Sequence, residues 1–240
     1  MAVNTVHRAD RDHRLYLWFA IFMPLIVLLG FARTYYLRGV FNGPAVPSLL
    51  VHVHGAVMTS WVLLFIAQVW LVASRRTKLH MRLGIAGAVL ASLVVVIGML
   101  TGIAAAARDH TPGPPALQFL IIPLGDVFLF GILIGVALYF RRRLDIHKRL
   151  MLVAAIHLLP PAISRIPVSF ITNGGPLAFF GLTDLCLLTC LAIDTIKNRK
   201  LHPAFLWGTI AVIAWQPLRI LIAGTSTWNQ FAAWLVSFAR

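Results

Sequence analysis

The chain has 240 residues, of which 60% are hydrophobic and only 12% are charged. A soluble protein of this size would need far more polar surface, so the composition excludes a soluble globular domain and predicts an all-α, polytopic membrane protein. The formal net charge of +14 raises the question of nucleic acid as a partner, and the positions of the basic residues argue against it, as shown below.

Seven segments are apolar and long enough to cross a bilayer as helices of about 20 residues. They are residues 15–37, 48–73, 83–107, 117–140, 149–171, 176–196 and 204–224. Residues 1–14 are expected to form a cytoplasmic N-terminal segment, residues 15–224 one transmembrane domain, and residues 225–240 an amphipathic interfacial helix. Nothing after the first span resembles a signal-peptide cleavage site, so we expect this span to remain as an anchor.

The basic residues lie mostly on one side of the predicted membrane. Fifteen of the 21 Lys and Arg residues fall in the segments on the side of the N-terminus: Arg8, Arg11, Arg14, Arg75, Arg76, Lys78, Arg82, Arg141, Arg142, Arg143, Lys148, Arg149, Lys197, Arg199 and Lys200. This asymmetry predicts a bacterial inner-membrane protein with a cytoplasmic N-terminus and a periplasmic C-terminus. It also predicts contacts between the cytoplasmic loops and anionic lipids rather than nucleic acid.

A short sequence motif occurs twice in the basic loops. RRTKLHMRL at 75–83 matches RRLDIHKRL at 142–150 after a shift of 67 residues, and NRKLHPAF at 198–205 keeps only its basic–Leu-His centre. The pattern predicts an anchor helix followed by three helical hairpins, the first two forming a parallel repeat. We expect His80 and His147 in loops just before the third and fifth spans, either satisfying free backbone N–H groups or ligating a group on the inner side.

The stretch LLVHVHGAVMTSW at 49–61 places two histidines near the outer end of the second span. Because residues two apart face nearly opposite sides of a helix, His52 and His54 cannot share one face. The face of His54 continues through Met58, Trp61, Phe65 and Gln68, so His54 should face the bundle and His52 the membrane surface.

Six ionisable residues from five different spans are expected in the outer half of the membrane: His54, Asp126, His157, Arg165, Asp184 and Arg219. Charge inside a membrane is costly, so such residues normally face a cavity or pair with one another. The chain has seven Asp and no Glu, and two aspartates would here face two arginines. These residues predict either structural salt bridges or a polar cavity.

One interpretation of this cavity is a redox site. His54 and His157 would be the axial ligands of haem b, with Arg165 or Arg219 near its propionates, and His80 and His147 could hold a second haem. The layout resembles, in outline, the b561-type cytochromes, which implies electron transfer to a redox partner. The chain departs from that family because His80 and His147 are expected in loops, and because the repeat position of His54 is Ile121.

Three further interpretations stay open. His54, His157, Asp126 and Asp184 could bind zinc or iron, since imidazole and carboxylate suit these metals. Alternatively, Asp and His could relay protons in a proton-linked or small-solute transporter. The third possibility is a cofactor-free membrane scaffold or assembly protein that binds another membrane protein. The chain contains no HExxH motif and no Ser-His-Asp arrangement of a known hydrolase, so whether it is an enzyme is left undecided.

Spans two to seven, with their His-x-Arg-Leu loops, also resemble a family of small uncharacterised bacterial membrane proteins. That resemblance implies a polytopic helical fold and brings no particular activity with it.

Overall fold

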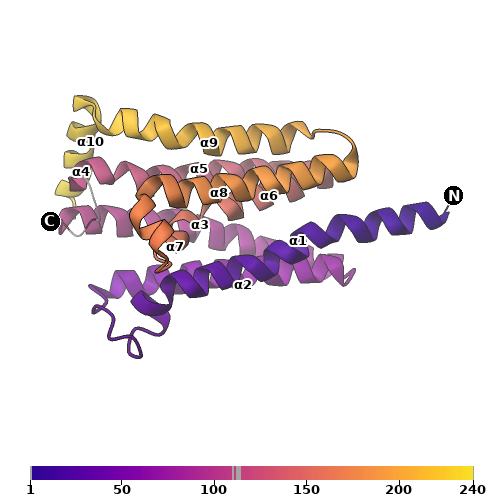
Figure 1. The fold of residues 1–240 in the computed structure, drawn as a ribbon, viewed down its shortest axis with the longest axis horizontal. Helices are drawn as coiled ribbons and strands as arrows, with labels where there is room; N and C mark the ends of the chain where they lie inside the picture. Colours follow the sequence, from indigo (N-terminus) through magenta and orange to yellow (C-terminus); the bar gives the residue numbers. More distant parts are fainter. Residues whose placement is uncertain (1, 110, 112–114, 240) are drawn as a thin grey trace.

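The computed structural model describes the backbone of residues 2–109, 111 and 115–239, and the side chains of these residues from Arg14 onward. Every regular element in the described residues is a helix (Figure 1). In chain order they are α1 (Ala2–Phe31), the π-helix η1 (Ala32–Tyr36), α2 (Leu49–Ala73), α3 (Thr77–Ala107), α4 (Ala116–Phe119), α5 (Ile121–Tyr139), α6 (Leu144–His157), α7 (Pro160–Ile163), α8 (Ser169–Asn198), α9 (Pro203–Ala223) and α10 (Ser226–Ser237).

The all-α polytopic fold predicted from the sequence is confirmed. Seven helical segments in the described residues are long and apolar enough to cross a membrane: 14–36, 49–73, 77–107, 116–139, 144–163, 169–198 and 203–223. Three of them begin five to seven residues earlier than predicted. Polar residues at the membrane surface end the hydrophobic run, but they remain helical. Hydropathy alone therefore places the N-terminal ends of these helices too late in the sequence.

The fifth span lies at the centre of the bundle. Its helix α6 packs against α5, α8 and α9, and the successive helices α2 and α3, α5 and α6, and α8 and α9 form three packed hairpins. The span is the most buried of the seven and also the least hydrophobic. High burial and low hydrophobicity are related here, because polar side chains are unfavourable in contact with lipid and are therefore found in the protein interior.

The two basic motifs begin their helices with the same hydrogen bonds. The amides of Leu79 and His80 donate to the carbonyl of Arg76, and the amides of Ile146 and His147 donate to that of Arg143. Each hydrogen bond recurs after the shift of 67 residues found in the sequence. The predicted loop positions of His80 and His147 are wrong, because both histidines lie within the first turns of α3 and α6.

Proline and glycine interrupt the helices near the opposite end of the bundle. Pro160 and Pro161 cannot donate backbone hydrogen bonds, and they separate α6 from the single turn α7. The stretch expected to separate the fifth and sixth spans lies within α8, where two helical segments meet at a kink, because Gly175 has non-helical angles (φ +53°, ψ −137°). Helix α1 packs on α7 so closely that a Cβ at Gly30 would lie 2.1 Å from the carbonyl oxygen of Ala162.

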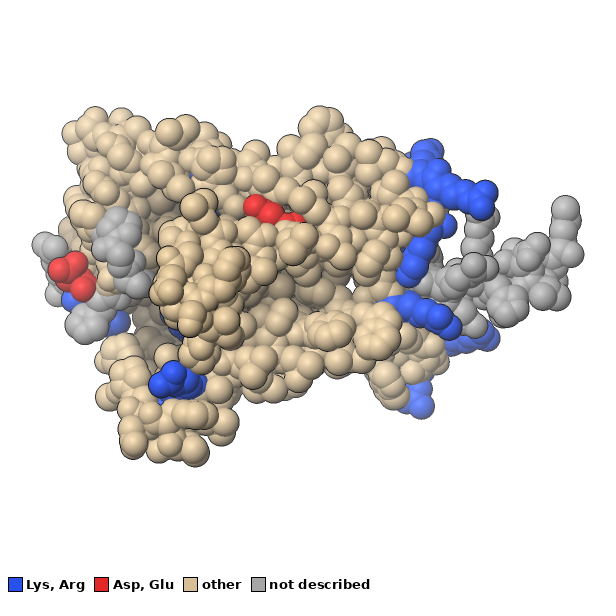
Figure 2. Space-filling model, viewed as in Figure 1, with Lys and Arg blue, Asp and Glu red and all other residues tan. Residues whose placement is uncertain are grey.

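Positive charge is concentrated at one end of the molecule. Figure 2 shows most of the visible Lys and Arg side chains at the end that contains the α8–α9 turn, and beside it a long belt in which one acidic patch and no Lys or Arg are visible. This end, which we call the basic end, includes the α2–α3 and α5–α6 turns with Arg75, Arg76 and residues 141–143. At the other end α10 lies across the bundle, where Ala232 and Val236 are buried and Trp228 Nε1 donates to the carbonyl of Leu117 at 2.8 Å.

Candidate functional site

A buried ion pair joins α5 to α9 in the half of the membrane away from the basic end. The guanidinium of Arg219 donates to the carboxylate of Asp126, and Arg219 is only 1% exposed. His157, at the end of α6, donates from Nε2 to the carbonyl oxygen of Asp126 at 3.0 Å, and the same nitrogen lies 3.8 Å from the Asp126 carboxylate. Three of the six predicted residues therefore form one contiguous group.

Two packing features hold this ion pair in place. The ring of Phe180 on α8 lies 4.3 Å from Cζ of Arg219, a cation–π contact that covers the guanidinium. Gly125 allows α5 to approach α9, because a Cβ there would lie 2.3 Å from the indole ring of Trp215. Arg219 Nη2 is buried without a hydrogen-bond partner among the described atoms, so one donor of the guanidinium is unsatisfied.

Asp184 makes a different contact from the one expected. Its carboxylate accepts a hydrogen bond from Gln216 Nε2 at 2.6 Å, which links the middle of α8 to α9. Asp184 is only partly buried, whereas Asp126 is 8% exposed. Gln216 and Arg219 are three residues apart on α9, so they lie on neighbouring parts of one helix face and meet the two aspartates separately.

The expectation that two aspartates neutralise two arginines is thus only half right. Arg165 forms no ion pair with a carboxylate in the described part of the chain. Its Nη1 donates to the carbonyl of Pro161 at 2.6 Å, and its guanidinium lies 4.9 Å from the ring of Phe31. The reason is its position in the turn between α7 and α8, where it faces the end of α1 and not α5 or α9.

The face of α2 predicted to look into the bundle is confirmed, since Trp61 and Phe65 are both buried. His54 is partly buried on this face, and His52 is exposed, with its ring 5.8 Å from that of Tyr35. Among the described residues, no hydrogen bond or ion pair joins His54 to Asp126, His157 or Arg219, so His54 lies outside the Asp126 group.

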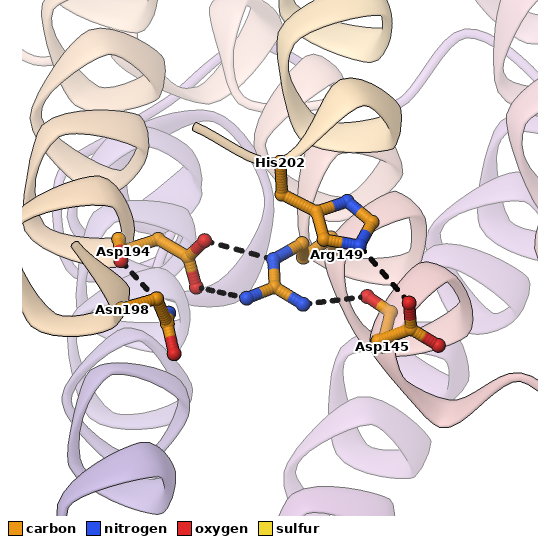
Figure 3. Close-up of polar contacts among 5 residues, drawn as sticks. All are labelled: Asp145, Arg149, Asp194, Asn198 and His202. Atoms are coloured by element: carbon orange, nitrogen blue, oxygen red, sulfur yellow. Dashed lines mark hydrogen bonds and ion pairs between the residues drawn. The ribbon is translucent and has the colours of Figure 1, made fainter. Parts of the chain in front are cut away.

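A second buried network lies towards the basic end (Figure 3). Arg149 on α6 binds Asp194 on α8 with both arms of its guanidinium: Nε lies 2.8 Å from Oδ2 and Nη2 lies 3.0 Å from Oδ1. Its remaining nitrogen, Nη1, donates to the carbonyl of Asp145 at 2.8 Å. The carboxylate of Asp145 accepts from His202 at 3.0 Å, and Asn198 Nδ2 donates to the carbonyl of Asp194. Helices α6, α8 and the start of α9 are therefore tied together.

Sequence reasoning missed this network because Arg149 was counted with the basic loop. Arg149 is 4% exposed and lies within α6, because the helix begins at Leu144, a full turn before the predicted span. A signal was present on α8. Thr183, Leu187, Cys190 and Asp194 are spaced by four, three and four residues, and all four are buried. That spacing places Asp194 on the buried face of a helix.

An apolar layer separates the two networks. Val153 lies between Arg149 and His157 on α6, Leu187 lies between Asp184 and Asp194 on α8, and Val212 lies midway along α9. Val153 and Leu187 are fully buried, Val212 is 1% exposed, and all three belong to the same core cluster. The two buried ion pairs are thus separated by an apolar core, whereas the Asp145–His202 pair of the second network lies at the surface.

The two motif histidines hold their own hairpins together. His147 Nδ1 donates to the carbonyl of Ala137 in the last turn of α5, at 2.8 Å, and so satisfies a carbonyl near the helix end. His80 lies beside Gln68 on α2. In the amide orientation that satisfies both neighbours, the Gln68 nitrogen donates to His80 Nδ1 at 2.7 Å and its oxygen accepts from the amide of Gly84. His80 and His147 are close enough to interact electrostatically.

The described residues give no support to a haem between His54 and His157 or to the four-residue metal site considered from the sequence. Two axial histidines must face each other across a porphyrin, whereas His157 is 4% exposed and its Nε2 donates to the carbonyl oxygen of Asp126. For a metal ion, the proposed set was His54, His157, Asp126 and Asp184. Among the described residues, no three His, Cys, Asp or Glu side chains lie together as metal ligands would.

The chain was compared with models of protein families, with curated proteins and with solved structures, and none of the three comparisons found a match.

Proposed function

We propose that this chain is a membrane assembly or accessory protein of the bacterial inner membrane that acts by binding another integral membrane protein. One observation carries the proposal. The two buried ion pairs, Asp126–Arg219 and Arg149–Asp194, are each closed within the bundle, and fully buried apolar residues lie between them. Charges that bind a substrate must leave most of their hydrogen-bonding capacity free, whereas these charges join helices of the same chain, and of their atoms only Arg219 Nη2 is buried without a partner among the described residues.

In this proposal the basic end faces the cytoplasm, where its arginines contact anionic lipids. The buried ion pairs contribute specificity: they fix how α5, α6, α8 and α9 rotate against each other, and so fix the outer surface that a partner binds. Buried polar groups have this role in some helix assemblies.

The test replaces both charged side chains of one ion pair by apolar side chains of similar size. The double variant Asp126→Leu/Arg219→Met removes both partners, and no unpaired charge is left in the core. We expect this variant to insert, to fold and to unfold within a few degrees of the wild-type protein, and the purified wild-type protein to show no Soret absorbance. A Soret band lost in His54→Ala or His157→Ala would overturn the proposal in favour of haem.

A proton-linked carrier is the second candidate, because Arg219 keeps a buried nitrogen, Nη2, without a partner among the described residues, and lies three residues along α9 from Gln216, which binds Asp184. A solute or water could bind at this donor. The measurement is the change of internal pH in proteoliposomes after an external pH jump, for the wild-type protein and for Asp184→Asn. Proton uptake that Asp184→Asn abolishes would favour the carrier, and uptake no faster than in empty vesicles would favour the assembly protein.

A further inference from the structure

A groove lined by two arginines opens at the end of the molecule away from the basic turns. It lies where η1, the loop 37–48 and the turn between α7 and α8 meet, and Arg33, Thr34, Asn42 and Arg165 line it. Both arginines are exposed, and they come from parts of the chain more than 130 residues apart. Neither belongs to the two buried networks described above.

The backbone around the groove has an uncommon and well-bonded geometry. The first span ends in a π-helical turn, in which the amide of Leu37 donates to the carbonyl of Ala32 at 2.8 Å. Such turns are rare and are often found at functional sites. The following loop folds back on this turn, with Asn42 in the left-handed region and Gly43 so close that a Cβ there would lie 2.1 Å from the carbonyl oxygen of Arg33.

Within the described side chains, the two guanidinium groups of the groove, those of Arg33 and Arg165, have no carboxylate partner, although Nη1 of Arg165 donates to the carbonyl of Pro161 at 2.6 Å. Each guanidinium lies near an aromatic ring instead: Arg33 is 5.9 Å from the ring centroid of Phe41 and Arg165 is 4.9 Å from that of Phe31. The hydroxyl of Thr34 is buried without a hydrogen-bond partner.

From this geometry we infer that the groove binds a phosphate-bearing anion. Planar guanidinium groups match the oxygens of phosphate, and two of them on one groove would neutralise most of its charge. The Thr34 hydroxyl supplies one further donor for the same oxygens. The groove lies at the end of a membrane-spanning segment, the depth of lipid headgroups. The phosphate therefore belongs either to a phospholipid or to a free anion, and the inference does not depend on the assembly role proposed above.

The experiment uses the purified full-length protein and has two arms. In one arm, inorganic phosphate is titrated by isothermal calorimetry at constant ionic strength. In the other, delipidated protein is mixed with phosphatidylglycerol, and with diacylglycerol as the phosphate-free control, and bound lipid is counted by native mass spectrometry. Binding in the first arm alone identifies a free anion, and binding in the second alone identifies a headgroup; either result supports the site if the variants below weaken it.

The variants are Arg33→Gln and Arg165→Gln, and the matched control is Arg38→Gln at the same end, whose Nη1 already donates to the carbonyl of Pro44. We expect each groove variant to weaken binding on the order of tenfold or more, the value of one hydrogen bond to a charged group, and the control to change it much less. If a glutamine variant fails to fold, Arg33→Lys and Arg165→Lys keep the charge but lose the guanidinium fork, and should also weaken binding. The inference is wrong if neither ligand binds, or if the groove variants bind as tightly as Arg38→Gln.

Discussion

Arg82 and Arg149 occupy the same position in the two copies of the basic motif, yet only Arg149 is buried. The first-turn hydrogen bonds of the two helices are the same in both copies, so the difference in burial comes from tertiary contacts. Helix α6 lies at the centre of the bundle, where α8 presents Asp194 to the guanidinium. Arg82 starts a more peripheral helix and is exposed. The motif thus specifies the start of a helix, whereas tertiary contacts determine whether its arginine is buried.

Arg149→Lys should destabilise the protein, because an ammonium group cannot make the two parallel bonds to Asp194 and the third bond to the Asp145 carbonyl. We expect a loss of about 1.5–3 kcal/mol, the value of one hydrogen bond to a charged group. The measurement is unfolding in detergent micelles, followed by circular dichroism. Arg82→Lys is the matched control and should leave the midpoint unchanged; an equal effect of both substitutions would contradict the structural assignment of Arg149.

Asp126 and Arg219 should behave as a unit. Asp126→Ala leaves the guanidinium unpaired in the core, which we expect to cost on the order of 3–5 kcal/mol. Removing Arg219 as well should recover part of this loss. A double-mutant cycle of Asp126→Ala and Arg219→Ala measures the coupling, with the exposed Asp109→Ala as the control. Simple additivity of the two single effects would show that the two side chains do not interact.

At the scale of elements, α1 is held to α7 by close backbone contact at Gly30. Gly30→Ala places a methyl group against the carbonyl of Ala162, so the two helices must move apart. We expect a cost of about 1–3 kcal/mol, as for other overpacked interiors. Gly135→Ala on α5 is the control, because a Cβ there meets nothing within 4 Å. The thermal midpoint in micelles should fall for the first variant only, and an unchanged midpoint for Gly30→Ala would mean that the contact is not tight.

The sequence predicts the number and order of the membrane helices but not all of their ends. Hydropathy detects the lipid-facing part of a helix, so the first turns of α3 and α6, with His80 and His147, were assigned to loops. Pro160 and Pro161 are visible in the sequence inside the fifth predicted span, and they interrupt its helix between α6 and α7, because proline cannot donate a backbone hydrogen bond. The sequence also placed a break between residues 171 and 176, and the helical dihedral angles are interrupted there, at Gly175, where φ is +53° and ψ is −137°.

At the scale of the whole molecule, the sequence likewise predicts only part of the candidate site. The position of a residue along its span predicts its depth in the membrane. On this basis Asp126, His157 and Arg219 were expected at a similar depth. Which side chains meet depends on how each helix is rotated and on which neighbours it has, and neither follows from a single sequence. The pairing of Arg219 with Asp126, the bond from Gln216 to Asp184 and the network around Arg149 therefore needed the structure.

The arrangement of charge predicts how the whole molecule sits in a membrane. All three helical hairpins turn at the basic end, and the positive-inside rule places such turns in the cytoplasm. The α3–α4 connection lies at the other end, so Thr111 should face the periplasm. Labelling needs a background in which the native thiols are removed, here Cys186→Ala/Cys190→Ala.

In that background, Thr111→Cys should react with a membrane-impermeant maleimide in intact cells. Ser74→Cys, exposed in the α2–α3 turn, should react only after the inner membrane is permeabilised. The two variants are controls for each other, because they differ only in the end of the bundle that carries the thiol. The opposite labelling pattern would reverse the orientation, and it would place the arginine groove and the C-terminal end of the last span in the cytoplasm.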